Sequence, residues 1–297
     1  MKTFWALTKR NVKVFFKDKG AFFSSLITPI ILLVLYMTFL AKVYRDSFVS
    51  GLNGYSAPES LVNGTVAGQL MSSLLAVCCV TVAFCSNLLC VQDKTSGAAN
   101  DILVSPVKRP AIAAAYSFAS FFATIIITLT ATAACLIYVA ATGWYMSFTD
   151  VLLVITDVVL LSAFGTALSS VVNSFLSTQG QAQAVGTIVS AGYGFICGAY
   201  MPISQFGDGL RNTLAFLPGT YGTMLIRNHS LNGVYAEMAK HGFPDATIIG
   251  IRDSIDCNVY FFGSKIETWV AYLVLIGAIL LLAGLYVLLY NLRRKQK

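Results

Sequence analysis

The fold of this chain is decided by residues 66–90, VAGQLMSSLLAVCCVTVAFCSNLLC. This stretch carries no charged residue, and it lies inside a longer uncharged run from Ser60 to Gln92. A helix of about 20 apolar residues crosses the hydrocarbon core of a bilayer, which is about 30 Å thick. Apolar residues occur all around the expected helix rather than at alternate positions, so the pattern predicts a membrane-spanning helix and excludes a β-barrel strand.

The rest of the chain has the same character. Its 297 residues are 57% hydrophobic and 11% charged, whereas soluble domains average about 25% charged residues. These figures exclude a soluble globular domain, a disordered chain and a disulfide-stapled secreted domain. A polar run from Asn173 to Gln183 predicts a turn that divides one long apolar block in two. The expected fold is an all-α polytopic membrane protein with six transmembrane helices, at about residues 21–41, 66–90, 112–141, 151–172, 184–203 and 268–290.

Basic residues near the ends of the spans give the expected orientation. With six spans, one side of the membrane receives the N-terminal segment, the 91–110 loop and the C-terminal tail, which together hold thirteen of the twenty Lys and Arg residues and only three acids. The 204–267 loop on the other side holds five bases and six acids. We therefore expect a multi-pass protein of the cell (cytoplasmic) membrane with both termini in the cytoplasm. The basic surplus serves orientation and attraction to anionic membrane lipid, and nothing in it indicates nucleic acid.

The first 20 residues predict an amphipathic helix that lies in the membrane interface, with apolar side chains near one face and basic side chains on most of the rest. Its representative residues are Trp5, Lys9, Val12 and Phe16. The alternative is a simple basic flank to the first span. No cleavable signal peptide is expected, because the following apolar segment is long enough to cross the membrane. The chain thus divides into an amphipathic helix, residues 1–20, and a transmembrane domain, residues 21–297.

No pattern in the sequence predicts catalysis or metal binding. The sequence has no Gly-x-x-x-x-Gly-Lys-Ser/Thr loop, so we expect neither an enzyme nor a nucleotide site in this chain. The two histidines, His229 and His241, fall in the expected external loop and in no metal-ligand spacing. Six of the seven cysteines lie in predicted spans, where Cys behaves as a small apolar residue, and Cys257 has no evident partner.

Asp157 is the one acidic or basic residue inside a predicted span. A carboxyl group at that depth marks a functional site by default. The alternative is a structural role, in which Asp157 bonds to a Ser or Thr of a neighbouring helix. A proton relay needs more than one such group, and the spans offer no second one.

The loop between the second and third spans carries the most informative sequence, QDKTSGAANDILVSPVKRP at residues 92–110. It predicts a short helix with charged residues on one side and Ile102, Leu103 and Val104 on the other. Pro106 ends this helix, because the residue before a proline is pushed away from helical dihedrals. A short exposed helix of this kind suits docking into a groove on a soluble partner.

At these residues the chain resembles the type-2 ABC exporter permeases. In that family the loop after the second span reads acid-basic-acid, then Gly-Thr-Leu-Glu, two apolar residues and Val-Thr/Ser-Pro. The residues that match at the same spacing are Asp93, Lys94, Gly97, Ile102, Leu103, Val104, Ser105 and Pro106. Asn100 stands where the family has Glu, and Ala98-Ala99 replace Thr-Leu. A second resemblance lies in GAYMPIS at residues 198–204, followed by LPGTY at 217–221 and a basic residue, Arg227.

The resemblance implies an assembly of several subunits. Two permease copies, as a homodimer or a closely related heterodimer, would form the path, and ATP-binding cassette ATPase subunits beneath them would hold ATP and Mg, so no cofactor is expected in this chain. The 1–20 helix would be a connecting helix against the ATPase, and the 91–109 segment would be a coupling helix in a cleft of the ATPase. The expected coupling residues are Asp93, Lys94, Gly97, Asn100, Asp101, Ile102, Leu103 and Val104.

The resemblance also implies a re-entrant hairpin before the last span and a conduit between the two copies. Proline and glycine interrupt residues 202–221 before a full span forms, and the expected gate residues are Gly198, Pro202, Pro218 and Tyr221. Spans one and five would meet at the dimer interface, where the candidates to line the conduit are Phe22, Tyr36, Tyr193 and Phe195. Small residues in spans four and five predict close helix packing, for which packing within one copy is the alternative.

The substrate class rests on the external loop and on the bulky apolar spans. The 204–267 segment is expected to form a small folded cap, and we favour export of an amphipathic drug, antibiotic or peptide-like molecule. The alternative is export of a cell-envelope glycan or lipid. An ion-coupled secondary transporter would need coupling groups at mid-membrane and preferably an inverted repeat, and a non-transporting membrane anchor would not need the 91–109 helix.

Overall fold

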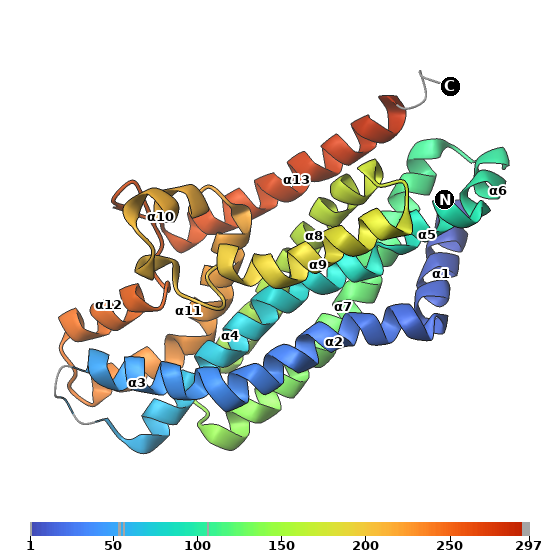
Figure 1. The fold of residues 1–297 in the computed structure, drawn as a ribbon. Coiled ribbons are helices and arrows are strands. Elements are labelled where there is room, and N and C mark those ends of the chain that lie inside the picture. Colours follow the sequence, from blue (N-terminus) through green and yellow to red (C-terminus); the bar gives the residue numbers. More distant parts are fainter. Residues whose placement is uncertain (1, 53–54, 56, 106, 293–297) are drawn as a thin grey trace.

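The computed structural model describes residues 2–52, 55, 57–105 and 107–292, and it is almost entirely helical (Figure 1). Its α-helices are α1 Lys2–Lys17, α2 Lys19–Leu35, α3 Ala41–Gly51, α4 Glu59–Ser86, α5 Leu89–Ser96, α6 Ala98–Val104, α7 Arg109–Thr142, α8 Phe148–Phe175, α9 Gln179–Ile196, α10 Asp208–Leu214, α11 Pro218–Lys240, α12 Asp245–Ser254 and α13 Thr268–Leu292. A π-helical turn, η1 Tyr36–Leu40, joins α2 to α3, and a 3₁₀ turn, η2 Ile203–Gln205, precedes α10. Two short antiparallel strands, β1 Tyr260–Phe261 and β2 Ser264–Lys265, complete the described elements. The all-α expectation is confirmed.

Five helical segments are long and apolar enough to cross a membrane: Lys19–Asp46, Glu59–Ser96, Arg109–Thr142, Phe148–Phe175 and Thr268–Tyr290. They coincide with five of the six expected spans. The other expected span, 184–203, falls mainly on α9, which is not among the five. The fold of a polytopic helical membrane protein is therefore confirmed, and the count of six spans stays a prediction.

The turn between α8 and α9 is shorter than the polar run predicted. Only residues 176–178 lie between the two helices. Thr178 accepts a hydrogen bond from the Gln181 backbone N–H, and the Gln181 side chain accepts one from the Thr178 N–H, so a capping box begins the helix inside the glutamine-rich run. The helix ends near Gly198, which has φ +74°, a left-handed conformation that favours glycine.

The bundle is built around α4, the helix that contains the opening sequence. Nearly all of its residues are buried, because α2, α7, α8, α9 and α11 pack around it (Figure 1). Glycine permits a close approach of two helices: a Cβ at Gly165 in α8 would lie 2.9 Å from the Cys79 carbonyl oxygen in α4. Small residues in the expected fourth span thus pack within one copy.

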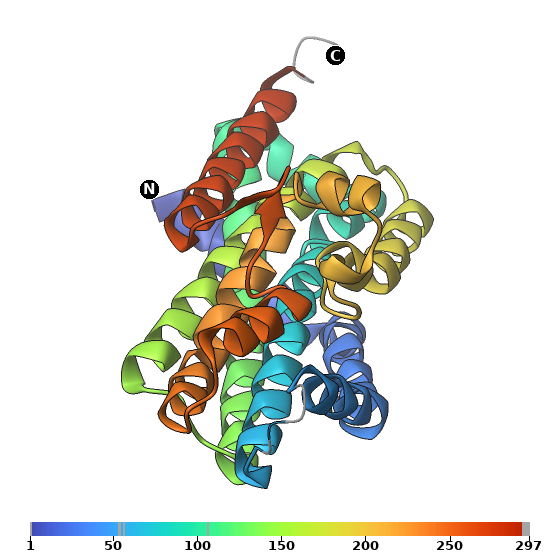
Figure 2. The ribbon, with the colours of Figure 1, turned by 90° about the vertical axis from the view of Figure 1, so that its left-hand side faces the viewer.

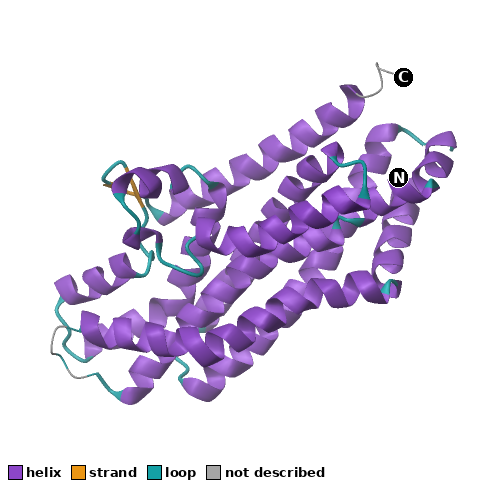
Figure 3. Cartoon of the chain, viewed as in Figure 1, coloured by secondary structure: helices purple, strands orange, loops and turns teal. Residues whose placement is uncertain are grey.

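The 204–267 segment is not a separate cap. Its long helix, α11, packs against α4, α8 and α13 and buries Met224, Leu225 and Ile226 almost completely. The sequence analysis assigned α11 to an external cap because many of its residues are polar. Its apolar side chains nevertheless face the core. The rest of the segment, α10, α12 and the β1–β2 hairpin, lies at the end of the bundle with α3 (Figure 3).

The two ends of the bundle carry different parts of the chain. Helices α1, α5 and α6 lie at one end together with the last turns of α13, whereas α3, α10 and α12 lie at the other (Figure 1). This division agrees with the partition of charge in the sequence, since the first group includes the basic N-terminal segment and the 91–110 loop. We call the first group the basic end and the second group the opposite end.

Candidate functional site

The N-terminal helix packs on the bundle as well as presenting an exposed face. Thr8, Asn11 and Phe15 are buried. The centroid of the Phe4 ring lies 5.4 Å from the centroid of the Phe118 ring of α7. Of the four representative residues of this helix, Trp5 is 52% exposed, Lys9 is exposed, and Val12 and Phe16 are half-buried. The predicted amphipathic helix is therefore present, and its polar face together with Trp5 remains available to a partner or to the membrane surface.

Asp93, an expected coupling residue, faces inward. It is buried on α5, where Arg10 of α1 donates hydrogen bonds to both carboxylate oxygens and the Tyr116 hydroxyl donates another at 2.6 Å. The hydrogen bond to Asp93 raises the pKa of Arg10 above its ordinary value. Asp93 therefore ties α1, α5 and α7 together, and its carboxylate is not free for a docking partner.

Lys94, the next residue, also turns toward the bundle. Its ammonium donates to the carbonyl oxygens of Asn173, at 3.1 Å, and Leu176, at 3.3 Å. These carbonyls end α8, where a helix leaves acceptors without intrahelical partners and a cation is favoured. The acid-basic pair that the sequence assigned to partner docking thus anchors three neighbouring helices at the basic end.

The expected coupling segment becomes exposed at Thr95 and Ser96, and α5 ends at its C-cap, Gly97. This residue has φ +85°, and a Cβ there would meet no atom within 4 Å, so Gly97 is needed for its backbone conformation rather than for space. Helix α6 follows, and none of its residues, 98–104, is buried. Asn100 and Asp101 are exposed.

The three apolar residues of α6 do not share one face, because consecutive helical residues point in different directions. Ile102 is half-buried and packs with a small cluster that includes Tyr116, whereas Leu103 is 38% and Val104 87% exposed. The predicted common apolar face is wrong in this respect. Pro106, expected to end the helix, lies outside the described residues. The surface open to a partner consists of Leu103, Val104, Asn100 and Asp101, beside a hollow between α1 and α6.

Near the end of α9, a buried ion pair holds the expected gate segment. Arg227 of α11 is 1% exposed and donates to the carbonyl oxygens of Gly198, at 2.9 Å, and Ile255, at 2.6 Å. Its guanidinium lies 3.7 Å from Asp256, whose carboxylate accepts the backbone N–H groups of Ile203 and Ser204. The sequence pointed to Arg227 only as a basic residue after a motif, and nothing in it signalled Asp256.

The other expected gate residues lie in the segments around the Arg227–Asp256 ion pair. Pro202 is buried, and Pro218 begins α11, where the missing N–H of proline costs no hydrogen bond. Tyr221 is buried and donates to the Ala215 carbonyl oxygen at 2.5 Å. Residues 202–221 are thus broken into η2, α10 and the start of α11, as proline and glycine predicted, and their re-entrant placement in the membrane stays a prediction.

The four conduit candidates are not brought together on one surface. Tyr36 and Tyr193 are buried in the main core, where neither hydroxyl has a hydrogen-bond partner among the described residues. Phe22 is half-buried near Phe16. Phe195 is 52% exposed on α9 and packs edge-to-face on Tyr200, with ring centroids 5.0 Å apart.

Asp157 is fully buried, and its partners differ from those expected. One carboxylate oxygen lies 2.5 Å from His229 Nδ1 of α11, and the other accepts the Tyr272 hydroxyl of α13 at 2.6 Å. The expectation of a Ser or Thr partner is therefore wrong, because α11, assigned to an external loop, packs beside α8. The arrangement joins three helices.

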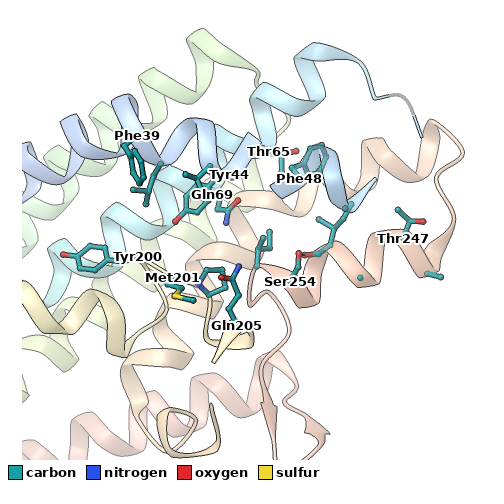
Figure 4. Close-up of a pocket in the computed structure, with 18 residues that line it drawn as sticks. Phe39, Tyr44, Phe48, Thr65, Gln69, Tyr200, Met201, Gln205, Thr247 and Ser254 are labelled. Atoms are coloured by element: carbon teal, nitrogen blue, oxygen red, sulfur yellow. The ribbon is translucent and has the colours of Figure 1, made fainter. Parts of the chain in front are cut away.

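A cavity with polar and apolar walls lies toward the opposite end (Figure 4). Its volume is about 580 Å³, and it lies between α2–η1–α3, α4, the segment after α9 and α12. Its lining residues are Phe39, Leu40, Val43, Tyr44, Phe48, Gly51, Thr65, Gln69, Tyr200, Met201, Pro202, Gln205, Ala246, Thr247, Gly250, Ile251, Ser254 and Ile255. We call it the outer pocket; sequence reasoning missed it, because four separate stretches of the chain contribute to it, 39–51, 65–69, 200–205 and 246–255.

The comparisons with known proteins agree with this architecture. The sequence pattern of the family described as ABC-2 type transporter matches residues 2–229, which is most of the chain. The match includes α1, the 91–110 loop, the outer-pocket residues up to Gln205 and the buried Arg227. A search of the curated proteins finds no match. The chain belongs to the ABC-2 type transporter family, as a transmembrane subunit of an ABC transporter that works with an ATP-binding cassette subunit.

Proposed function

We propose that two copies of this chain form the path of an exporter in the cell membrane, which moves an amphipathic drug, antibiotic or peptide-like molecule outward. The observation that carries the proposal is the separation of two surfaces along the bundle. The exposed α1–α6 surface lies at the basic end, and the outer pocket lies toward the opposite end. If the basic end faces the cytoplasm, the ATPase docks on one side and the pocket opens toward the other.

The basic end has the features of an ATPase docking surface. Leu103 and Val104 present apolar side chains away from the bundle, while Asp93 and Lys94 fix the helix beneath them. An apolar side chain that stands clear of the bundle is stabilised when a protein groove covers it. The ATP and Mg would be held by the partner, and this chain would transmit the motion.

The exposed faces of α2 and α9 support a second copy. Ile30 and Ile31 of α2 and Ile188 of α9 are more than half exposed, and both helices pack on α4. Helix α9 also exposes Gln181 and Gln183, which are costly against hydrocarbon. A partner surface or an aqueous path suits these side chains better than lipid does.

Transport in inside-out membrane vesicles tests the proposal. Vesicles that contain this chain and its partner ATP-binding cassette subunit should accumulate an amphipathic fluorescent substrate when ATP is added. The matched control is the ATPase with its Walker A lysine replaced by alanine, which should abolish accumulation because the phosphate site is lost. Accumulation that needs no ATPase would contradict the proposal.

A protonophore separates ATP-driven export from ion-coupled transport. We expect accumulation to persist with the protonophore at undiminished ATP, and the Asp157→Asn variant to lose only a modest part of it. Asp157 contacts His229 and Tyr272, and these contacts support a role in joining helices rather than in proton transfer. Collapse of accumulation by the protonophore would favour the secondary transporter.

Export of a cell-envelope glycan or lipid is the second candidate. The aromatic and amide side chains of the outer pocket, such as Tyr200 and Gln69, also suit a sugar ring. Stimulation of the ATPase by a lipid-linked saccharide, with none by amphipathic drugs or peptides, would select this candidate.

A further inference from the structure

The outer pocket is lined without a single charge in the part of the chain that the structure describes. The buried ion pair of Arg227 and Asp256 does not line the pocket: the two terminal guanidinium nitrogens donate to carbonyl oxygens of Gly198 and Ile255, and the Asp256 carboxylate accepts backbone N–H groups. An unpaired charge taken from water into such a cavity loses its hydration without a counter-charge, which is costly. The lining therefore discriminates against charged molecules.

Gln69 gives the pocket a polar anchor. Its residue on α4 is 3% exposed, and it lines the cavity, where Figure 4 shows its amide beside Tyr44. Among the described residues, no partner donates to or accepts from this amide, whereas the neighbouring Tyr44 hydroxyl is already bonded to the Ala199 carbonyl oxygen at 3.0 Å. The Gln69 amide is not among the buried polar atoms closed off from solvent, so it is open to the cavity, where a ligand with a carbonyl or hydroxyl group would hydrogen-bond to it.

Flat and apolar surfaces form the rest of the pocket. Phe39 and Phe48 come from the α2–α3 side, and Tyr200 comes from the segment after α9. Helix α12 contributes Thr247, Ile251 and Ser254, which are spaced to lie on one helical face. The volume of about 580 Å³ lies within the usual range of small-molecule sites.

We propose that the outer pocket is a binding site for an uncharged amphipathic molecule with a planar ring, which hydrogen-bonds to Gln69 and packs under α12. This inference rests on the proposed exporter function for its physiological meaning, since the bound molecule would be cargo on its way out. It names the substrate class more narrowly, as neutral rather than cationic or anionic. Gln69 is its specificity-determining residue.

Dye binding to the purified full-length permease in lipid nanodiscs tests the site, with empty nanodiscs as the background. The probe is Nile red, an uncharged planar dye with a carbonyl oxygen, and rhodamine 6G is a cationic planar comparison. We expect saturable Nile red binding and at least tenfold weaker binding of rhodamine 6G. Equal or tighter binding of rhodamine 6G, with displacement of Nile red, would overturn the proposal.

Three variants locate the binding. Thr247→Trp fills the pocket and should abolish saturable Nile red binding, while Ile249→Trp is the matched control, because Ile249 is 51% exposed on the same helix and does not line the pocket. Gln69→Leu keeps a similar volume and should weaken binding by roughly three- to tenfold, the effect of one neutral hydrogen bond. Unchanged affinity in both Thr247→Trp and Gln69→Leu, with normal gel filtration, would refute the site.

The binding and transport experiments distinguish an error in the proposed binding site from an error in the proposed exporter function. Dye binding needs neither ATP nor the ATPase, so pocket-dependent binding with no ATP-driven accumulation in vesicles would support the site and contradict the exporter. ATP-driven accumulation with the same dye affinity in every variant would support the exporter and overturn the site.

Discussion

Arg227 is the residue whose environment contrasts most with its chemistry. A guanidinium that is 1% exposed must be satisfied by several acceptors, and here it joins α4, α11 and the segments around Gly198 and Asp256. Removing one partner of a buried pair leaves the other charge uncompensated. The effect of a substitution at Arg227 should therefore be far larger than that of a substitution in a surface pair.

We predict that Arg227→Met destabilises the permease by about 3–5 kcal/mol, measured as a lowered thermal midpoint in detergent or nanodiscs. The control is Arg211→Met, which removes a cation that pairs with the exposed Asp208 and should cost less than about 1 kcal/mol. The double variant Arg227→Met/Asp256→Asn should recover part of the loss, because no unpaired carboxylate remains. Equal thermal midpoints for Arg227→Met and Arg211→Met would refute the inference that the buried Arg227 stabilises the fold.

The sequence predicted where the candidate site residues lie along the chain better than it predicted which neighbours their side chains contact. Asp93 and Lys94 were found in the correct loop, but their turn toward Arg10 and the end of α8 depends on helices distant in sequence. The partners of Asp157 were missed for the same reason, because His229 is brought to it only by the packing of α11. Hydrophobic periodicity reports burial along one helix and carries no information about which helices meet.

At the scale of elements, uncharged runs located five membrane-crossing segments. Uncharged runs did not identify α11 as a core helix. Glycine, polar residues and the buried Arg227 lower its average apolarity, although it is packed in the core. The uncharged runs also misplaced the start of α9, since a capping box turned a glutamine-rich stretch into the first helical turn. Composition identifies an apolar helix whether it is enclosed, as α4 is, or largely exposed, as α13 is, but it misses an enclosed helix such as α11 that is rich in polar residues.

Helix α6 yields a prediction about coupling. Leu103→Asp adds a charge to the exposed apolar surface of α6 and should abolish co-purification with the ATPase, since truncating a buried interface anchor already costs about 1–3 kcal/mol and a charge costs more. Expression and thermal stability should stay normal, because Leu103 is not buried within this chain.

Phe216→Asp is the matched control for Leu103→Asp. Phe216 is 62% exposed between α10 and α11, far along the chain from α6, so this charge should leave ATPase binding intact. A Leu103→Asp variant that expresses normally and retains ATPase binding would remove α6 from the coupling surface.

At the scale of the whole molecule, the first prediction concerns orientation. Ser96→Cys at the basic end should be protected from a membrane-impermeant maleimide in intact cells, whereas Ser254→Cys on α12 should be labelled, because both side chains are exposed but lie at different ends. Native Cys257 should stay silent, since burial raises the pKa of its thiol to about 11 and only the thiolate reacts. Labelling of Ser96→Cys from outside would reverse the topology.

The second whole-molecule prediction concerns the copy number. Gly186 on α9 and Gly284 on α13 both leave open space where a Cβ would stand, and Figure 2 places the two helices on separate sides of the bundle. Gly186→Leu should weaken a dimer that forms through α2 and α9, whereas Gly284→Leu should leave it unchanged. Mass photometry of the purified variants measures the fraction of dimers, and equal fractions would place the interface elsewhere.

The anchoring of α5 has a consequence for how force crosses the molecule. Because Asp93 is fastened to α1 and α7, and Lys94 to the end of α8, α5 serves as a rigid mount with little slack. If the ATPase docks on α6 as proposed, a displacement of α6 would be transmitted through α5 to α1, α7 and α8 together. Gly97, the left-handed residue between α5 and α6, would then be the hinge about which α6 turns while α5 stays fixed.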